Sequence, residues 1–168
     1  LSMTATQALL ADTVPANQMN AVITKLSDNS KKWAMEYGLS TKSVNEGMQE
    51  LVKAGYDANQ VTASMPAILN ASKASGEDFN TVMQATTSIL SQYGLGAKEA
   101  GRVTDSLSYV ANKTKAGFKD MGDAMVYVGP VAKSVGMDVE QTASAIGILS
   151  NAGIQEIGRA SCRERVSS

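Results

Sequence analysis

Apolar residues recur along most of the chain at the spacing of helices that bury one face. Between residues 41 and 54 they occupy positions i, i+4, i+7 and i+8, as Val44, Met48, Leu51 and Val52, and a longer stripe runs from residue 79 to residue 93. This spacing is typical of amphipathic α-helices. The pattern predicts an all-α fold with about seven short amphipathic helices, near residues 17–37, 41–54, 58–75, 78–93, 97–115, 119–135 and 139–152.

Glycines separate the predicted helices, and each is usually followed by an apolar and then a polar residue. They are Gly38, Gly55, Gly94, Gly117, Gly136 and Gly153, with Gly76 fitting more loosely. A Gly just after a helix adopts the left-handed conformation easily, and the apolar residue after it can pack back on the last turn. Asp57 with Gln60 and Asp138 with Gln141 predict capping boxes for the helices that follow. Because the connections span only two to five residues, we expect consecutive antiparallel hairpins with Gly caps.

Several helix breakers lie inside the predicted helices. Pro66 and Pro130 should each kink a helix or start a new one, because proline removes a donor and clashes with the preceding turn. Five glycines also fall mid-helix, each costing about 1 kcal/mol relative to Ala: Gly47, Gly101, Gly122, Gly129 and Gly147. They predict close contacts between helix axes or a structure that must bend. No strict sequence period is present, so a regular solenoid is not predicted.

Composition narrows the classes of function. The chain has 168 residues, 43% of them hydrophobic but only 5% aromatic, which favours one domain of packed helices. A net charge of −1 gives no electrostatic reason to expect nucleic-acid binding. One Cys and no His exclude Cys/His zinc sites, His-based triads and an intramolecular disulfide. The longest apolar run, 124–132, is too short to span a bilayer, so we expect no transmembrane segment.

The amino-acid composition of the sequence changes at Glu156. Residues 156–166, which include the single Cys162, look like the translation of a common DNA sequencing adapter, with a basic terminal tail as the alternative. We therefore predict a helical region over residues 1–155, incomplete at its C-terminal end, and a non-native tail over residues 156–168. The chain starts on Leu1, which also suggests an internal fragment.

The sequence contains only weak candidates for phosphate or cation binding. The segment from Gly94 to Gly101 has the glycines of a phosphate loop but lacks the Gly-Lys-Ser/Thr ending and follows a helix, so a helix–helix connection is favoured. Asp120 and Asp123 could offer two carboxylates to a cation. Because they lie at a predicted helix start, a capping role is favoured instead.

Candidates for hydrolysis and for an adaptable binding groove are equally weak. Glu36, Glu46, Glu50 and Glu77 could supply paired carboxylates for glycan cleavage. None has an apolar setting that would raise its pKa, so a solvated face is expected. The nine Met lie mostly at stripe positions and predict an adaptable core, with an exposed Met-rich groove as the less favoured reading. We predict no catalytic, cofactor-binding or metal-binding residue.

Three segments together resemble the core region of phage tail tape measure proteins. Residues 47–61 resemble the family's helix–Ala-Gly-aromatic–helix junction, residues 65–72 its Pro-containing helix, and residues 127–155 its Gly-Pro-Val-Ala and Asn-Ala-Gly-Ile signatures. The resemblance covers about residues 14–155. In the family the pattern continues beyond the last signature, so Ile148 and Leu149 are expected to lack packing partners here.

The resemblance implies a structural virion protein of a tailed phage or prophage. Tape measure proteins set tail length and take part in tail assembly and DNA delivery. The implied partners are tail tube and tail-assembly chaperone proteins and further copies of the chain, and the implied location is the tail lumen after synthesis in the bacterial host cytoplasm. No catalytic residue comes with this region, so we expect no enzyme. The alternatives are a non-phage helical protein-interaction scaffold and, less favoured, a muralytic helical domain.

Overall fold

The computed structural model describes residues 2–152, and these residues form eight α-helices and one 3₁₀ helix without a β-strand. The prediction of an all-α fold is therefore confirmed for this part of the chain. The helices are α1 (Ser2–Leu10), α2 (Ala16–Tyr37), α3 (Thr41–Lys53), α4 (Ala58–Ser75), α5 (Phe79–Gln92), η1 (Ala97–Glu99), α6 (Ala100–Lys113), α7 (Phe118–Ser134) and α8 (Val139–Asn151).

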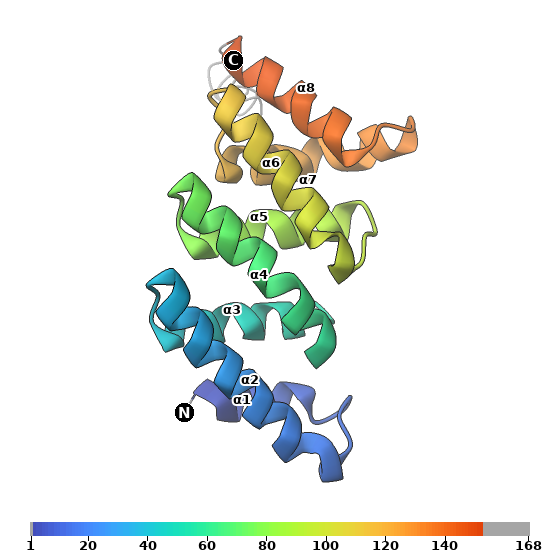
Figure 1. Ribbon diagram of the computed structural model, residues 1–168. Helices are drawn as coiled ribbons and strands as arrows, with labels where there is room; N and C mark the ends of the chain where they lie inside the picture. The colour runs from blue at the N-terminus through green and yellow to red at the C-terminus, as the bar shows by residue number, and fades with distance from the viewer. Residues whose placement is uncertain (1, 153–168) are drawn as a thin grey trace, which may run out of the picture.

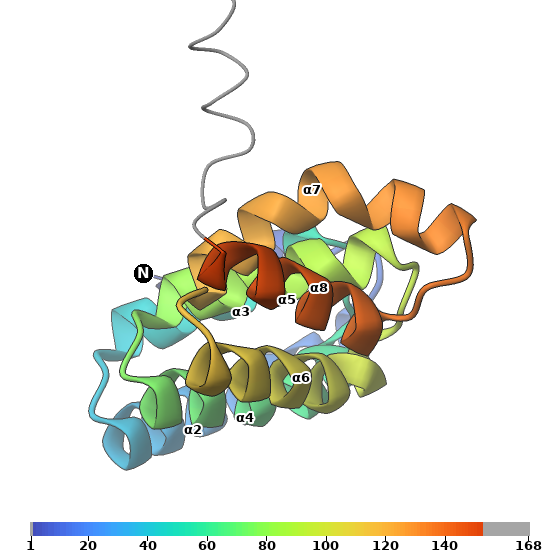
Figure 2. The same cartoon turned by 90° about the horizontal axis from the view of Figure 1, so that it is seen from above.

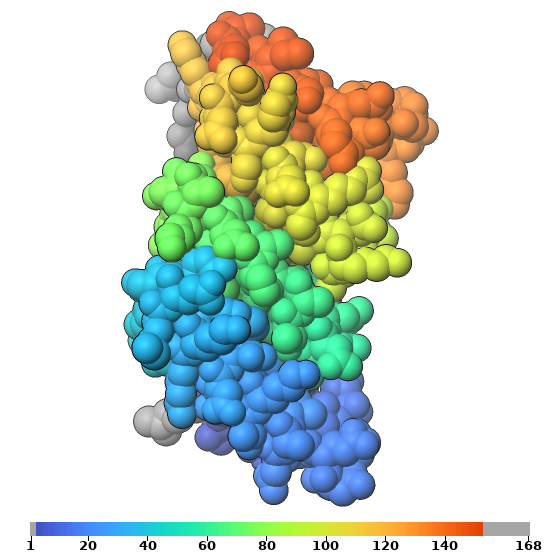
Figure 3. Space-filling model, viewed as in Figure 1, coloured from blue at the N-terminus to red at the C-terminus, as the bar shows by residue number. Residues whose placement is uncertain are grey.

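The helices form a stack of four hairpins in two layers. Helices α1, α3, α5 and α7 lie in one layer and α2, α4, α6 and α8 in the other, with consecutive helices alternating in direction (Figure 1). The second layer forms a continuous face (Figure 3). The most extensive contact between helices joins α5 to α7. This regular stacking was not predicted from the sequence. The placement of the helices repeats from one hairpin to the next, whereas the residues at equivalent positions do not.

The seven predicted helices are all present, with ends within two residues of those expected. The predicted helix 97–115 is divided into η1 and α6. Helix α1 was missed. Its buried side chains are Thr6 and Leu10, so its nine residues show too little periodicity to be distinguished from a terminal segment.

Glycines end five of the helices as predicted. Gly38, Gly55, Gly76, Gly94 and Gly136 all have φ between 64° and 99°. The residue after such a Gly bonds back to the last turn, as in Leu39 N to Ala34 O at 3.0 Å and Leu95 N to Leu90 O at 2.8 Å. The prediction for Gly117 was wrong, since its φ is −87° and it is the N-cap of α7. Gly153 lies outside the described residues.

Both predicted capping boxes are present. The Asp57 carboxylate accepts from Gln60 N at 2.8 Å, and the Gln60 side chain accepts from Asp57 N at 2.8 Å. Asp138 and Gln141 make the same pair of bonds, at 2.7 and 3.1 Å. These bonds satisfy backbone donors that the first turn leaves free. They fix the starts of α4 and α8.

Three of the mid-helix glycines mark close contacts, as predicted. A Cβ on Gly47 would lie 2.6 Å from the Phe79 ring, and one on Gly147 would lie 2.6 Å from Val110. A Cβ on Gly122 would lie 3.0 Å from Cβ and 3.1 Å from Cα of Ala85, so α5 and α7 meet backbone to backbone. At Gly129 the added Cβ would lie 3.3 Å from the sulfur of Met125 in the same helix, a tight contact with a flexible side chain, and 3.6 Å from Gln92 of α5. Gly101 has open space.

Two further expectations concern proline and methionine. Pro66 and Pro130 lie inside α4 and α7, and neither starts a new helix. Six methionines are buried, which confirms that most of them lie in the core: Met19, Met48, Met65, Met83, Met121 and Met125. Met35 is the one strongly exposed methionine of the described residues, so the methionines do not form an exposed groove.

Candidate functional site

The four candidate carboxylates for hydrolysis do not form a site. Glu36 is exposed near the end of α2, and Glu46 and Glu50 are exposed on α3. Glu46 lies 3.9 Å from Lys42 and Glu50 lies 3.2 Å from Lys53, as oxygen-to-Nζ distances. These surface pairs belong to the solvated face that the sequence predicts.

Glu77 has a structural role that sequence reasoning missed. It lies in the loop between α4 and α5, and its two carboxylate oxygens accept from Phe118 N at 2.9 and 3.2 Å. A Cβ on Gly117 would lie 3.0 Å from Glu77 Oε1. Glu77 therefore caps α7 from 41 residues away along the chain, and the glycine leaves room for it.

Asp120 and Asp123 have separate partners. Asp120 Oδ2 accepts from Gly117 N at 3.1 Å, which confirms its capping role at the start of α7. Asp123 Oδ2 lies 2.7 Å from Lys119 Nζ, one turn earlier. The start of α7 thus receives carboxylates from Glu77 and Asp120, which complement its backbone N–H groups.

The segment from Gly94 to Gly101 is a helix–helix connection, as predicted. Gly94 ends α5 in the left-handed conformation, and η1 follows at Ala97. Lys98 and Glu99 both lie in η1. A Cβ on Gly94 would lie 3.3 Å from Lys133 Nζ, so the α7 lysine lies close to this turn.

One ion pair joins the last two helices of the second layer. Arg102 of α6 donates to both oxygens of Glu140 in α8, at 2.6 and 2.9 Å. The hydrogen bond to Arg102 is the largest cause of a lowered pKa for Glu140, and the same bond raises the pKa of Arg102 further above its ordinary value. Sequence reasoning did not find this pair, because its members are 38 residues apart.

Buried polar contacts also link helices that are distant in sequence. Ser30 of α2 donates to Asn45 Oδ1 of α3 at 2.5 Å. The hydroxyls of Tyr93, after α5, and Thr142, in α8, share a buried hydrogen bond. Such bonds set which helix faces meet. They are contacts of the fold and do not form a cluster open to a ligand.

The three segments that resemble tape measure proteins include two turns of this stack, and residues 65–72 lie inside α4. Gly55, with φ 99°, ends α3, and the half-buried Tyr56 packs on the core. Asn151, in the last of the three segments, accepts from Lys115 N at 2.8 Å and so ties the end of α8 to the loop before α7.

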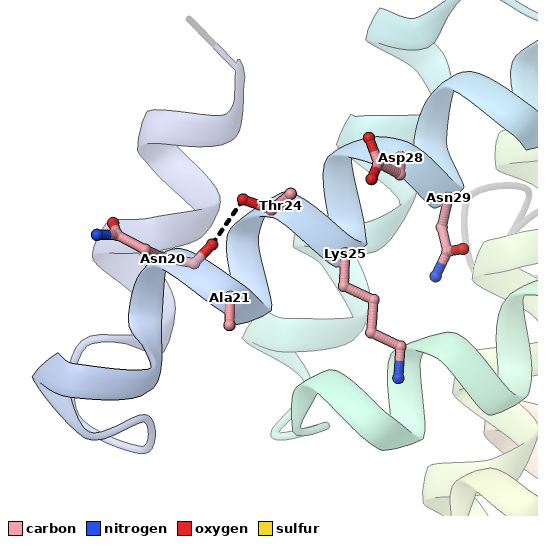
Figure 4. Close-up of a pocket in the computed structure, with 6 residues that line it drawn as sticks. All are labelled: Asn20, Ala21, Thr24, Lys25, Asp28 and Asn29. Atoms are coloured by element: carbon pink, nitrogen blue, oxygen red, sulfur yellow. Dashed lines mark hydrogen bonds between the residues drawn. The ribbon is translucent and has the colours of Figure 1, made fainter.

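The surface hollows are open to solvent and shallow. One lies along α2 and is lined by Asn20, Ala21, Thr24, Lys25, Asp28 and Asn29 (Figure 4). All six residues come from a single helix, and the Thr24 hydroxyl donates to the Asn20 carbonyl at 2.8 Å. A second hollow lies between α2 and α4. Neither gathers the convergent polar groups of an enclosed ligand site.

Metal-binding clusters and membrane-spanning helices are both absent from the part of the chain that the structure describes. Among residues 2–152, no group of three or more His, Cys, Asp or Glu side chains is placed to hold a metal ion. No helix in the same part of the chain is long and apolar enough to cross a bilayer. Cys162 and the whole predicted adapter segment, residues 156–168, lie outside the described residues, so their origin stays a prediction.

Comparison with known proteins gives one match. A family described as phage-related minor tail protein matches residues 27–160, most of the chain. The matched range contains α3 to α8 entirely and the second half of α2. It also includes the first five residues of the segment predicted to derive from an adapter. No curated protein and no solved structure matches the chain significantly.

Proposed function

Because this chain belongs to the phage-related minor tail protein family, we propose that it is a segment of a tail tape measure protein from a tailed phage or prophage. In this role it helps to set tail length and takes part in tail assembly and DNA delivery. The observation that carries the proposal is the family match, whose range, residues 27–160, includes all of α3 to α8. The three segments that resemble the tape measure core all lie within the matched range.

The architecture suits a protein that works through its length. Each hairpin of the stack contacts mainly its neighbours, so hairpins can be added or removed with the remaining contacts intact. The stack extends in one direction (Figure 1). A protein with an active cleft would instead need groups that converge from several elements.

The same proposal gives partners and a location. The partners are the tail tube and the tail-assembly chaperone proteins, and the location is the tail lumen after synthesis in the host cytoplasm. The segment acts by assembly and without catalysis. In support, Glu46, Glu50 and Glu77 each have a structural or surface partner in the described chain.

Tail length tests this function directly. An in-frame deletion of residues 76–116 in the phage gene removes α5 and α6 with their flanking turns. As one hairpin of the stack, the deleted segment accounts for roughly 10 Å, the spacing of packed helices. As a continuous helix along the tail, at about 1.5 Å per residue, it corresponds to roughly 60 Å, and we propose this extended form for the assembled tail. Duplication of the same residues should lengthen tails by a similar amount. Tail lengths are measured on electron micrographs of intact virions.

The matched control is Lys42→Ala, which removes one side chain from the exposed face of α3 and should leave tail length unchanged. Virions of normal tail length from both the deletion and the duplication would rule out the tape measure function. They would leave membership of the minor tail family intact.

A further inference from the structure

Helix α7 lies at the C-terminal end of the stack and exposes apolar side chains (Figure 2). Ala124, Tyr127 and Val131 are spaced by three and four residues and so lie on one side of the helix. We call these three residues the outer side of α7. Ala124 is half-buried, whereas Tyr127 and Val131 are 74 and 65% exposed. An apolar surface of this kind indicates that another helix or a partner binds there.

The contact between α5 and α7 has a definite register. A Cβ on Gly122 would lie 3.0 Å from Cβ of Ala85, and one on Gly129 would lie 3.6 Å from Cβ of Gln92. Counted from the first residue of α5, Ala85 is at position 7 and Gln92 at position 14. Counted in the same way in α7, Gly122 is at position 5 and Gly129 at position 12. The two helices therefore run in the same direction with a constant shift of two residues.

The contact between α3 and α5 shares this register. Gly47 is at position 7 of α3, and a Cβ on it would lie 3.1 Å from Cε of Met83, at position 5 of α5, as well as against the Phe79 ring. At both contacts, position 7 of one helix thus meets position 5 of the next helix of the same layer. In α7, positions 7 and 14 are Ala124 and Val131, both on the outer side. The outer side of α7 therefore repeats the surface on which α5 receives α7.

We propose that the outer side of α7 is the docking surface for one further helix of the same polypeptide. This docking helix is the first helix of the hairpin that follows α8 in the natural chain after Gln155. Its position 5 lies on Ala124 and its position 12 on Val131, so the stack continues by the contact that joins α7 to α5. The inference rests on the proposed function, in which residues 1–155 are a segment of a longer tail protein.

The path of the chain favours a helix of the same polypeptide. After α2, α4 and α6, the chain turns back, and the helix that follows packs on the preceding helix of its own layer. Three residues separate α2 from α3 and α4 from α5, and four separate α6 from α7. An equally short turn after α8 would bring the docking helix directly onto α7. Because so short a connection holds the helix beside its docking surface, the contact costs little loop-closure entropy.

A second copy of the chain cannot offer the same contact. The residues at position 5 of α1, α3, α5 and α7 are Thr6, Asn45, Met83 and Gly122. All four are buried within the stack to which they belong. A second copy would therefore have to open one of its own contacts before it could cover the outer side of α7 in this register. A further helix of the same polypeptide meets no such obstacle.

The thermal stability of two chains tests the proposal. One is the 168-residue chain. The other, the extended chain, has the natural sequence through the next hairpin in place of residues 156–168. Val131→Asp should lower the melting temperature of the extended chain by roughly 5 °C or more, because it buries a carboxylate without a partner. In the 168-residue chain the melting temperature should stay nearly the same, because Val131 is exposed there. Circular dichroism measures both.

The matched control is Tyr109→Asp, which changes a residue of α6 that is 64% exposed and lies in the other layer. It should alter neither melting temperature. Equal effects of Val131→Asp in the two chains would overturn the proposal, as would an extended chain that gains no helical circular dichroism. A dimer of the 168-residue chain that Val131→Asp dissociates would show that a second copy covers α7 instead. None of these results changes the tail-length test of the proposed function, which is made on virions.

Disulfide formation tests the register, in extended chains whose other cysteines are replaced by Ser. Val131→Cys should link to a cysteine at position 12 of the docking helix and not to one at position 14, which faces the other side of that helix. The pair Gln92→Cys and Gly129→Cys is the positive control, because their Cβ atoms would lie 3.6 Å apart, within the range of disulfides. A preference for position 14, or links only between separate chains, would contradict the proposed contact.

Discussion

The two ends of the stack differ in what they expose and in how they are attached. At the N-terminal end, α1 is held by Leu10 and Thr6 and exposes Leu9 together with small and polar residues such as Thr4 and Gln7. At the C-terminal end, α7 is held by Phe118, by the close contact of Gly122 with Ala85 and by the cap from Glu77, yet presents Tyr127 and Val131.

This difference shows that a hairpin packed firmly against the stack on one side can still expose apolar side chains on the other side. Apart from Leu9, the exposed side chains of α1 are small or polar, whereas α7 exposes Val126, Tyr127 and Val131. Three substitutions test how firmly the C-terminal hairpin is attached, in order of expected effect.

Phe118→Ala should have the largest effect, because Phe118 is the first residue of α7 and is fully buried. Loss of a buried Phe side chain typically costs about 3–5 kcal/mol of unfolding free energy. Urea unfolding followed by circular dichroism measures the loss. The N-terminal counterpart is Leu10→Ala, for which we expect a smaller loss. An equal or larger loss for Leu10→Ala would contradict the stronger attachment of the C-terminal hairpin.

Gly122→Ala and Gly101→Ala should change stability in opposite directions. At Gly122 the new Cβ meets the backbone of Ala85, and overpacking of this kind costs about 1–3 kcal/mol. At Gly101 the added methyl group meets open space, so helix propensity should stabilise the chain by up to about 1 kcal/mol. The melting temperature of each variant is compared with that of the parent chain. A stabilised Gly122→Ala chain would show that α5 and α7 can separate without loss.

Glu77→Ala should have the smallest effect of the three. It removes the carboxylate that caps α7, and loss of a helix cap costs about 0.5–2 kcal/mol. Glu36→Ala, at an exposed position, is the control and should change the melting temperature little. Replacing Glu77 with Gln also tests whether the chain lacks catalytic activity. Cell-wall hydrolysis by the parent chain that Glu77→Gln abolishes would identify Glu77 as part of an active site.

Local signals allowed most of the secondary structure to be predicted. The starts of α4 and α8 follow from Asp57 with Gln60 and Asp138 with Gln141, since each box lies within four residues. Helix ends follow from glycines such as Gly38 and Gly136, whose left-handed conformation is a local property. Helix α1 escaped prediction because few of its residues are buried.

The candidate site residues show which contacts cannot be predicted from neighbouring residues in the sequence. The exposed roles of Glu46 and Glu50 followed from their polar surroundings, but the cap from Glu77 to Phe118 did not, because it crosses 41 residues. Gly117 was wrongly predicted to end a helix, because its contact with the distant Glu77 could not be seen in the sequence. Its N–H in fact donates to Asp120, and its missing side chain leaves room for Glu77.

The sequence by itself determined seven of the eight α-helices described and most of the caps that lie within one turn, because these depend on residue types and on neighbours within one or two turns. Only the tertiary structure decided how the hairpins stack, which glycines lie at close contacts, and that Tyr127, Val131 and Ile148 are exposed. Those properties depend on residues far apart in the chain, and periodicity shows that a helix has an apolar side without showing what packs against it.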